Sequence, residues 1–426
     1  MPTARPDTYD IASGADLWAG VDRPDAPLTM ADIANDAAWS WFSTPQAIYR
    51  NGASFVGHNT SVGSPTVTKL VHAGRSVSQF TLSAALQVDD HCVPSIAFWP
   101  DGTLQAAYSK LVDTVLRLRR TTSAEDISAW GSEQTVSTPG SVATTYASAR
   151  HLSGPGRMLV FTRIHAATGR INCYTHSADG ASWSSMVEFY RGASGSRPYM
   201  RHCKRGTDGV HFACTDMHPD SGQSSVYHFR GVWDAGTTAL KFYTTAGVEI
   251  TDSKPFLPAS ITQVYSGASA KAWICDIAVG ADGHPRVLFT TYPNNNGTDI
   301  RIMFSRWDGD EWTAAVDVVG ASVGTSLYGA EPYYTGLAVF DQEDPDLIHL
   351  SAEALVTGRY DVQRRRTDDN GATWALLQTV TSAASGQDAI RPVSPEGHNG
   401  ELPMVCLEGT YTSYTSYSMK LRGGFA

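Results

Sequence analysis

The residues of this chain best suited to chemistry are a histidine beside two carboxylates, a tyrosine and an arginine. Asp89 and Asp90 directly precede His91, and neighbouring carboxylates can set the tautomer of a histidine and raise its basicity. His91 stands just before a predicted inner β-strand, Tyr146 in TTYASARHLS stands just before the next one, and Arg163 ends that strand in MLVFTR. A cation that closes an apolar strand is costly unless it faces a wet cavity or a partner. Together these residues predict acid–base chemistry next to an anionic group.

A repeated unit of strand, turn and strand must position these residues. The turn is of the Asp-Gly type, and the flanking stretches are apolar or alternate with a period of two. Seven copies begin at Ser54, Pro94, Ser148, Tyr199, Asp276, Gly336 and Arg391. Their spacing of roughly 40 to 75 residues fits a four-stranded blade. The pattern predicts an all-β fold, a seven-bladed β-propeller with four-stranded antiparallel blades, whose inner strands line an axial channel into which Arg163 points.

The chain is expected to form one domain, because linkers rich in Pro or Gly are missing. Residues 51–426 are assigned to the propeller, and residues 1–50 to a segment that wraps the disc or completes a blade. Within that segment, residues 29–39 are the best helix candidate, with Thr29 as the N-cap. Three turns with aspartate followed by Trp, at 177–183, 307–312 and 367–374, are interpreted as fold elements in which Asp binds turn amides and Trp packs between blades.

Charge and composition limit the partners. The formal net charge is −10, so nothing indicates a basic face for nucleic acid. A polyanion remains compatible if a local cationic pocket overrides the global field. The six cysteines are scattered and are expected to be buried free thiols without disulfides. The opening MPTARPDTYD shows no apolar signal core, and no run is long enough to span a bilayer, so no membrane insertion is expected.

Five segments in order between residues 52 and 417 carry a resemblance to a known family: DDHCVPSIAFWPDGTLQAAYSK, TTYASARHLSGPGRMLVFTR, SRPYMRHCKRGTDGVHFACTDMHP, AWICDIAVGADGHPRVLF and IRPVSPEGHNGELPMVCLEGTYTSYTSY. In order and spacing they resemble the BNR-repeat family that contains ulvan lyases and related uronate lyases. The resemblance implies a propeller that cleaves the glycosidic bond beside a uronic acid by β-elimination, with His91, Tyr146 and Arg163 as catalytic residues and no required cofactor.

The chemistry of that reaction accounts for these residue types. Neutralising the uronate carboxylate acidifies the C5 proton, a base removes it, and an acid protonates the leaving oxygen. Arg163 supplies a permanent forked charge for the carboxylate, and Tyr146 and His91 can share the proton transfers. The chain departs from the family at its second histidine, whose place is taken by Lys110 or Leu111, and at Cys92, where the family often has Asn.

Further residues are predicted to line the path of an anionic sugar: Lys110, Arg197, Tyr199, Arg201, His218, Arg391 and His398. For the arginines among them, salt bridges between blades are the structural alternative. A separate set, His211, Cys214, His218 and His228, offers nitrogen and sulfur ligands for a structural Zn²⁺. A structural Ca²⁺, which takes oxygen ligands, is a further open alternative.

Three functions remain open at this level. The first is the lyase, acting on an acidic polysaccharide or oligosaccharide as a monomer, with an extracellular, periplasmic or virion-associated location favoured by the function. The second is a non-catalytic glycan-binding propeller, for example on a phage tail. The third is a sialidase-type glycoside hydrolase, suggested by the aspartate turns and many arginines. It requires a Tyr–Glu nucleophile pair and a triad of arginines, whereas the Glu residues of this chain are mostly expected in turns or outer strands.

Overall fold

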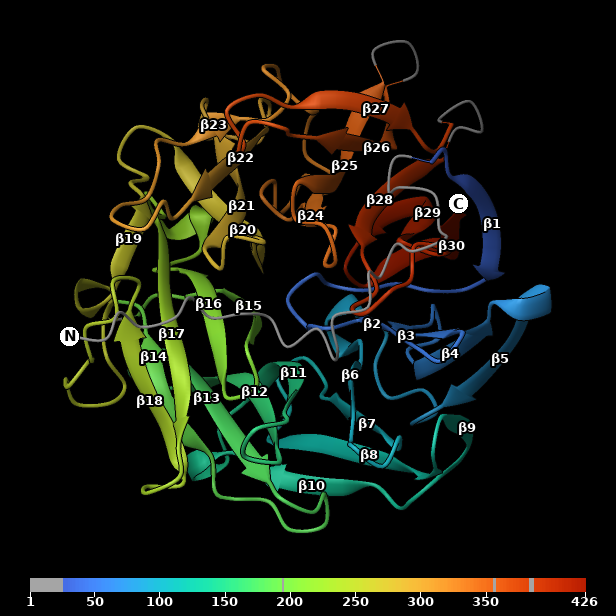
Figure 1. The fold of residues 1–426 in the computed structure, drawn as a ribbon, viewed down its shortest axis with the longest axis vertical. Coiled ribbons are helices and arrows are strands. Elements are labelled where there is room, and N and C mark those ends of the chain that lie inside the picture. The colour runs from blue at the N-terminus through green and yellow to red at the C-terminus, as the bar shows by residue number, and fades with distance from the viewer. Residues whose placement is uncertain (1–25, 194, 355–357, 383–386) are drawn as a thin grey trace.

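Seven antiparallel sheets are arranged in a ring around a central axis (Figure 1). The computed structural model describes residues 26–193, 195–354, 358–382 and 387–426. The predicted seven-bladed β-propeller is confirmed, and each blade has four strands in the ring order, with a short fifth strand added in two blades. Short alternating strands joined by tight turns form such blades because each sheet buries both faces against its neighbours.

The first four blades follow the chain order. Blade 1 contains β2 (Ala47–Arg50), β3 (Ala53–Asn59), β4 (Pro65–Val71) and β5 (Ser76–Thr81). Blade 2 contains β6 (Ser95–Phe98), β7 (Leu104–Tyr108), β8 (Val115–Ser123), β9 (Asp126–Trp130) and β10 (Gln134–Ser137). Blade 3 contains β11 (Thr144–Leu152), β12 (Arg157–Ala166), β13 (Gly169–Ser177) and β14 (Val187–Arg191). Blade 4 contains β15 (Met200–Arg205), β16 (Gly209–Thr215), β17 (Val226–Asp234), β18 (Ala239–Thr244) and β19 (Thr262–Tyr265).

The last three blades complete the ring. Blade 5 contains β20 (Lys271–Val279), β21 (Pro285–Tyr292), β22 (Arg301–Arg306) and β23 (Val316–Asp317). Blade 6 contains β24 (Ala338–Phe340), β25 (Leu347–Ala354), β26 (Arg359–Arg366) and β27 (Ala375–Thr379). Blade 7 contains β28 (Asp388–Val393), β29 (Met404–Ser413), β30 (Ser416–Phe425) and β1 (Thr29–Ala34). Within the described ranges the helices are single 3₁₀ turns: η1 (Ala73–Arg75), η2 (Asp90–Cys92), η3 (Pro139–Ser141), η4 (Pro219–Ser221) and η5 (Pro258–Ser260).

The N-terminal strand closes the ring. β1 pairs antiparallel with β30, so one blade combines both ends of the described chain (Figure 1). The helix predicted for residues 29–39 is therefore wrong. Helix propensity is a weak preference, and the free edge of β30 offers residues 29–34 a row of backbone hydrogen bonds that overrides it. Residues 1–25 of the expected N-terminal segment lie outside the described residues.

Between β1 and β2 the chain crosses the axis of the propeller. Residues 37–46, called the axial segment below, are all buried. The indole of Trp39 donates to the carbonyl of Arg391 at 3.1 Å, and that of Trp41 donates to the carbonyl of Ile274 at 3.0 Å. Two blades on different sides of the ring thus hold the segment, which fills the channel with aromatic side chains.

The remaining fold predictions concern turns and thiols. Asp179, Asp308 and Asp369 each accept hydrogen bonds from turn amides between the third and fourth strands of their blades, away from the axis. All six cysteines are buried and free, as predicted. In the described part of the chain, no helix has the length and apolar character needed to cross a membrane.

Candidate functional site

The predicted catalytic residues meet at one end of the propeller axis. The ring of His91 lies 5.1 Å from that of Tyr146, and the guanidinium of Arg163 lies 4.7 Å from the centre of the Tyr146 ring. His91 directly precedes inner strand β6, and Tyr146 lies near the beginning of inner strand β11. The inner strands of successive blades run in the same direction, so their beginnings gather at one mouth of the channel.

Two details of the sequence prediction need correction. Tyr146 is inside β11 rather than before it, at a bulge between Thr145 and Ser148, with a left-handed φ of 63°. Arg163 lies in the second strand, β12, opposite Thr145, and does not end an inner strand. A bulge turns a side chain out of the regular alternation, and a non-glycine residue at positive φ is a strained conformation that clusters at functional sites.

His91 is held as a cation. Its Nδ1 lies 2.6 Å from Oδ1 of Asp89 and 3.1 Å from Oδ1 of Asp90. Burial alone lowers the pKa of His91, but the charges and hydrogen bonds of the two carboxylates outweigh burial and raise the pKa to about 10. At neutral pH the ring is an imidazolium, which can bind an anion or give up a proton but cannot accept one.

Asp90 connects His91 to a buried arginine from the last blade. Its carboxylate lies 2.6 Å from Nη1 of Arg391 and accepts from the hydroxyls of Tyr334 at 2.6 Å and Tyr411 at 2.8 Å. Burial raises the pKa of Asp90, but Arg391, then His91 and Tyr334, lower it to about 2. Asp90 is therefore ionised at neutral pH, and its contact with Nδ1 helps to fix the orientation of the His91 ring.

Arg163 has aromatic rings in place of a counter-ion. Its guanidinium lies 4.7 Å from the Tyr146 ring and 4.4 Å from the Tyr199 ring, and Nη1 donates to the carbonyl of Pro198 at 3.2 Å. The side chain is buried, and it forms no ion pair with any described residue. Burial raises the pKa of Tyr146 well above its usual value, and the nearby Arg163 opposes that rise. A buried cation without a partner is suited to bind a carboxylate.

The axial segment forms the floor of this site. Phe42 lies 5.2 Å from the ring of Tyr146 and 4.7 Å from that of Tyr199. These three rings and Arg163 line a cavity of about 20 Å³, with room for about one water molecule. The channel is thus closed beneath the site, so a ligand reaches Tyr146 from one face of the disc only.

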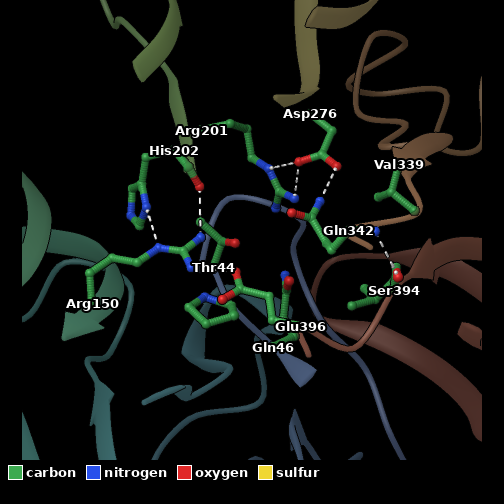
Figure 2. Close-up of a pocket in the computed structure, with 12 residues that line it drawn as sticks. Thr44, Gln46, Arg150, Arg201, His202, Asp276, Val339, Gln342, Ser394 and Glu396 are labelled. Atoms are coloured by element: carbon green, nitrogen blue, oxygen red, sulfur yellow. Dashed lines mark hydrogen bonds and ion pairs between the residues drawn. The ribbon is translucent and has the colours of Figure 1, made fainter. Parts of the chain in front are cut away.

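The opposite mouth carries a different arrangement of charges (Figure 2). There Arg150 pairs with Glu396 and bonds His202, and Arg201 pairs with Asp276 at 2.6 Å. Both arginines are buried and each already has a carboxylate. These pairs join residues of four blades, and the cavity between them holds about 10 Å³. This mouth is interpreted as a structural clamp, because its cations are neutralised within the protein.

The other predicted sugar-binding residues divide into two groups. Tyr199 stacks on Arg163, and the half-buried Arg197 lies two residues before it, at the candidate site. His218 is fully buried, 5.4 Å from the ring of Tyr199. Lys110 is half-buried in the turn after β7, and its side chain forms no hydrogen bond or ion pair with the described residues.

The structure does not bring the remaining predicted residues to open space at this mouth. Arg391 is fully buried and paired with Asp90, Arg201 belongs to the opposite mouth, and His398 is buried 2.8 Å from Asp341. For both arginines the salt bridge between blades is the arrangement observed. A side chain that is buried and already paired holds the fold rather than a ligand.

The four predicted metal ligands are not brought together either. Nδ1 of His211 and Nε2 of His228 share a hydrogen bond of 3.0 Å, whereas Cys214 is three residues from His211 and faces the other side of β16. His218 is engaged elsewhere. Among the described residues, three potential ligand atoms lie within 4.8 Å of one another in two other clusters: Asp89, Asp90 and His91, and His218, Asp220 and Glu331.

Sequence reasoning missed Glu331, a third acidic residue of the site besides Asp89 and Asp90. Its Oε1 lies 2.7 Å from Nε2 of His218. Burial raises the pKa of Glu331, but the hydrogen bond from His218 and the charges of His91 and Arg197 lower it overall. Like His91 and Tyr199, it stands in the loop before an inner strand, here β24. That position in the repeat was the available signal.

Two aromatic residues were also missed. Tyr334, from the same loop, stacks on His91 at 5.5 Å, and Tyr414, from the turn between β29 and β30, lies edge-on to His91 at 5.4 Å. Tyr414 is half-buried at the mouth. Tyr334 is fully buried, so the half-buried Tyr414 is the one of these two rings on which a sugar can pack, and the site combines a cationic side, near Arg163, with an aromatic side.

Comparison with known proteins bears on the family and the fold of this chain. Residues 51–317 match the family model described as "BNR repeat-containing family member". No curated protein matches the chain. Among solved structures, an ulvan lyase of polysaccharide lyase family PL25 is 15% identical, with a TM-score of 0.69 over 93% of this chain and 94% of that one. The same kind of enzyme bound to -[GlcA(1-4)Rha3S]- gives a TM-score of 0.70 at 15% identity, with the same coverage.

A second lyase has the same fold. Polysaccharide lyase Uly1 is 10% identical, with a TM-score of 0.58 over 94% of this chain and 99% of that one. At such identities these likenesses establish a shared fold and leave the activity open. The family match covers more than half of the chain and confirms the resemblance seen in the sequence, so this seven-bladed propeller belongs to the BNR repeat-containing family.

Proposed function

We propose that the protein is a polysaccharide lyase that cleaves a uronic-acid-containing glycan by β-elimination. One observation carries the proposal: Arg163 is buried with no carboxylate partner among the described residues, between the rings of Tyr146 and Tyr199 and near His91. A cation in that position has the charge and geometry to bind the carboxylate of a uronate. The ligand -[GlcA(1-4)Rha3S]- in a structure of the same fold is an acidic glycan of this class.

The proposed reaction assigns one role to each residue. Arg163 binds the uronate carboxylate and so acidifies the C5 proton. Tyr146, as phenolate, takes that proton, the bond between C4 and the leaving oxygen breaks, and a double bond forms between C4 and C5. Tyr146 then returns the proton to the leaving oxygen. The imidazolium of His91 orients the sugar and adds to the positive field at the carboxylate.

Two features of the free protein bear on the alternatives. His91 is protonated and Tyr146 keeps its proton, so neither is a ready base before a substrate binds. This favours a glycan-binding propeller without catalysis as the second candidate, as does Lys110 or Leu111 in place of the family's second histidine. A sialidase-type hydrolase has less support, because Glu331 is bonded to His218 and not to Tyr146.

The test is to follow the ultraviolet absorbance of the unsaturated uronate, a product that only a lyase forms, with a panel of acidic polysaccharides. Wild type is compared with Tyr146→Phe and Arg163→Ala, and glycan binding is measured beside turnover. Tyr243→Phe on β18 and Arg359→Ala on β26, whose side chain is 46% exposed, are the matched controls.

We expect Tyr146→Phe to abolish turnover and leave binding nearly intact, because only the hydroxyl is lost. Arg163→Ala should weaken both, because the carboxylate contact exists in the ground state and the transition state. Both controls should behave as wild type. Binding without product in every protein supports the glycan-binding propeller, and full activity of Tyr146→Phe refutes the catalytic assignment.

A further inference from the structure

One face of blade 3 carries a set of nitrogen-bearing side chains beside Tyr146. Arg163 on β12 lies directly opposite Asn172 on β13, and His165 lies directly opposite Arg170. Residues two apart on a strand share a face, and directly opposed residues on neighbouring strands are in contact. The four side chains therefore project from one face of the sheet, at the end of the β12–β13 hairpin that lies next to the candidate site.

The loop that leads into blade 4 adds a third arginine to this face. The backbone N–H of Arg170 donates to the carbonyl of Ser196 at 3.2 Å, and Nη1 of Arg163 donates to the carbonyl of Pro198 at 3.2 Å. Arg197 lies between these two carbonyls in the chain and is half-buried. The name cationic face is used below for the set Arg163, His165, Arg170, Asn172 and Arg197.

The charges of this face act on one another. Burial, followed by the three arginines, lowers the pKa of His165 to about 3, so the ring is neutral. Burial, followed by Arg163 and Arg197, also lowers the pKa of Arg170. Like charges gathered in this way repel one another and oppose folding. The arrangement is therefore costly for the free protein, and an anion would relieve it.

Counter-ions are missing from the cationic face. None of its three guanidinium groups forms an ion pair with a carboxylate of the described residues. The fully buried or nearly buried arginines elsewhere at the axis each have such a partner: Arg150, Arg201 and Arg391. Glu331, which feels the charge of Arg197, is engaged by His218.

Hydrogen-bond donors of the face are also unused. The Nε atoms of Arg163 and Arg170 and Nδ2 of Asn172 are buried donors with no hydrogen-bond partner among the described residues. Nε2 of the neutral His165, a donor or an acceptor according to the tautomer, has none there either. Asn172 is 6% exposed, and with Arg163 it lines the cavity beneath Tyr146. Buried polar groups normally have partners, and a set of orphan donors around positive charge matches the oxygens of an anion.

We infer that the cationic face is a second anion subsite, which binds a negatively charged substituent on the sugar next to the uronate. Arg163 is shared with the uronate, and Arg170 and Arg197 are specific to the second group. The chemical class is an oxyanion, a sulfate ester on the neighbouring sugar. Residues two apart on β12 are separated by roughly 7 Å, a spacing on the scale of one sugar ring. The inference rests on the proposed function for the place of the uronate.

The test measures binding in a Tyr146→Phe background, which keeps the ligand intact. The probes are oligosaccharides with the repeat -[GlcA(1-4)Rha3S]-, their desulfated counterparts and their carboxyl-reduced counterparts, titrated by calorimetry at fixed ionic strength. Arg170→Ala and Arg197→Ala are compared with Arg163→Ala and with the exposed control Arg359→Ala.

If the second group is a sulfate ester, Arg170→Ala and Arg197→Ala should each weaken binding of the intact probe about tenfold and leave the desulfated probe nearly unchanged. A loss that is seen equally with the desulfated probe, and that disappears on carboxyl reduction, places Arg170 and Arg197 at the uronate carboxylate itself and overturns the second subsite. Arg359→Ala should have no effect.

The inference is overturned if Arg170→Ala and Arg197→Ala bind the intact probe as the parent does, or if the parent binds none of the probes. If those two variants lose affinity while Arg163→Ala does not, the subsite stands and the uronate assignment fails. Product formation by the wild-type protein with the intact repeat is measured separately. If the two variants lose affinity as expected but the wild type yields no unsaturated product, the subsite stands and the lyase proposal is refuted.

Discussion

The positive charge on His91 depends mainly on the neighbouring carboxylate of Asp89. The substitution Asp89→Asn removes that carboxylate. Asp89 accepts from Nδ1 of His91 at 2.6 Å and from its backbone N–H at 2.9 Å, in a site where both side chains are buried. Asparagine preserves the shape and one acceptor but removes the negative charge. Burial, which lowers the pKa of His91, is then opposed only by Asp90.

The size of the effect follows from the pKa. A rise from 6.5 to about 10 corresponds to about 5 kcal/mol of preference for the imidazolium. One close opposite charge shifts a pKa by about 1–3 units, and Asp89 contributes both charge and a hydrogen bond. We expect the pKa of His91 in Asp89→Asn to fall by about three units to near 7, which is about 4 kcal/mol.

The sign of the pH dependence is fixed by the direction of this shift. His91 has a higher pKa in the folded than in the unfolded protein, so its contribution to stability is complete below pH 6.5 and is lost as the pH rises through about 10. The difference in unfolding free energy between wild type and Asp89→Asn is therefore largest, about 4 kcal/mol, below pH 6.5, and closes toward pH 10.

Two measurements check this. Nuclear magnetic resonance of histidines labelled at Cε1 gives the pKa of His91, and urea unfolding at pH 6 and pH 9.5 gives the free energies. Asp282→Asn, which removes a carboxylate 3.8 Å from the half-exposed His284, should leave the His91 resonance unchanged and cost less than about 1 kcal/mol. The reasoning is refuted if His91 of the wild type titrates near pH 6.5, or if the stability difference is the same at both pH values.

Three further outcomes are expected. Glu396→Gln leaves the buried Arg150 without its carboxylate and should lower the free energy of unfolding by about 3–5 kcal/mol, whereas Asp101→Asn, whose side chain is 57% exposed, should cost less than about 1 kcal/mol in the same urea titration. Equal losses would contradict the structural clamp. All six thiols should resist a thiol reagent in the native protein and react after unfolding. The reason is that burial raises the pKa values of the thiols, that of Cys275 to about 12. A disulfide found by mass spectrometry would contradict this. Any lyase rate should rise from neutral toward alkaline pH, because burial raises the pKa of Tyr146 and so holds its proton. The rate should fall above about pH 10, where His91 loses its charge. A rate that peaks below pH 7 would exclude Tyr146 as the base.

The fold follows from local patterns in the chain. Alternating strands and Asp-Gly turns specify each hairpin, and seven copies at regular spacing leave few ways to bury the blade faces other than a ring. The same regularity located His91 and Tyr146, because each stands where an inner strand begins. Residue types alone indicated acid–base chemistry, because a histidine preceded by two carboxylates, a tyrosine and an arginine that closes an apolar stretch are groups that such chemistry uses.

Only the tertiary structure decided which charges are free. Arg391 pairs with Asp90 across 301 residues of sequence, and Arg201 with Asp276 across 75, so no local pattern could separate these structural cations from Arg163. Glu331, from the loop between blades 5 and 6, and Tyr414, from blade 7, reach the site only because the ring closes. The strand at residues 29–34 depends on an edge supplied by the C-terminal end of the chain. Pairing of buried charges and closure of a ring are long-range effects, whose energy depends on partners that a sequence window does not contain.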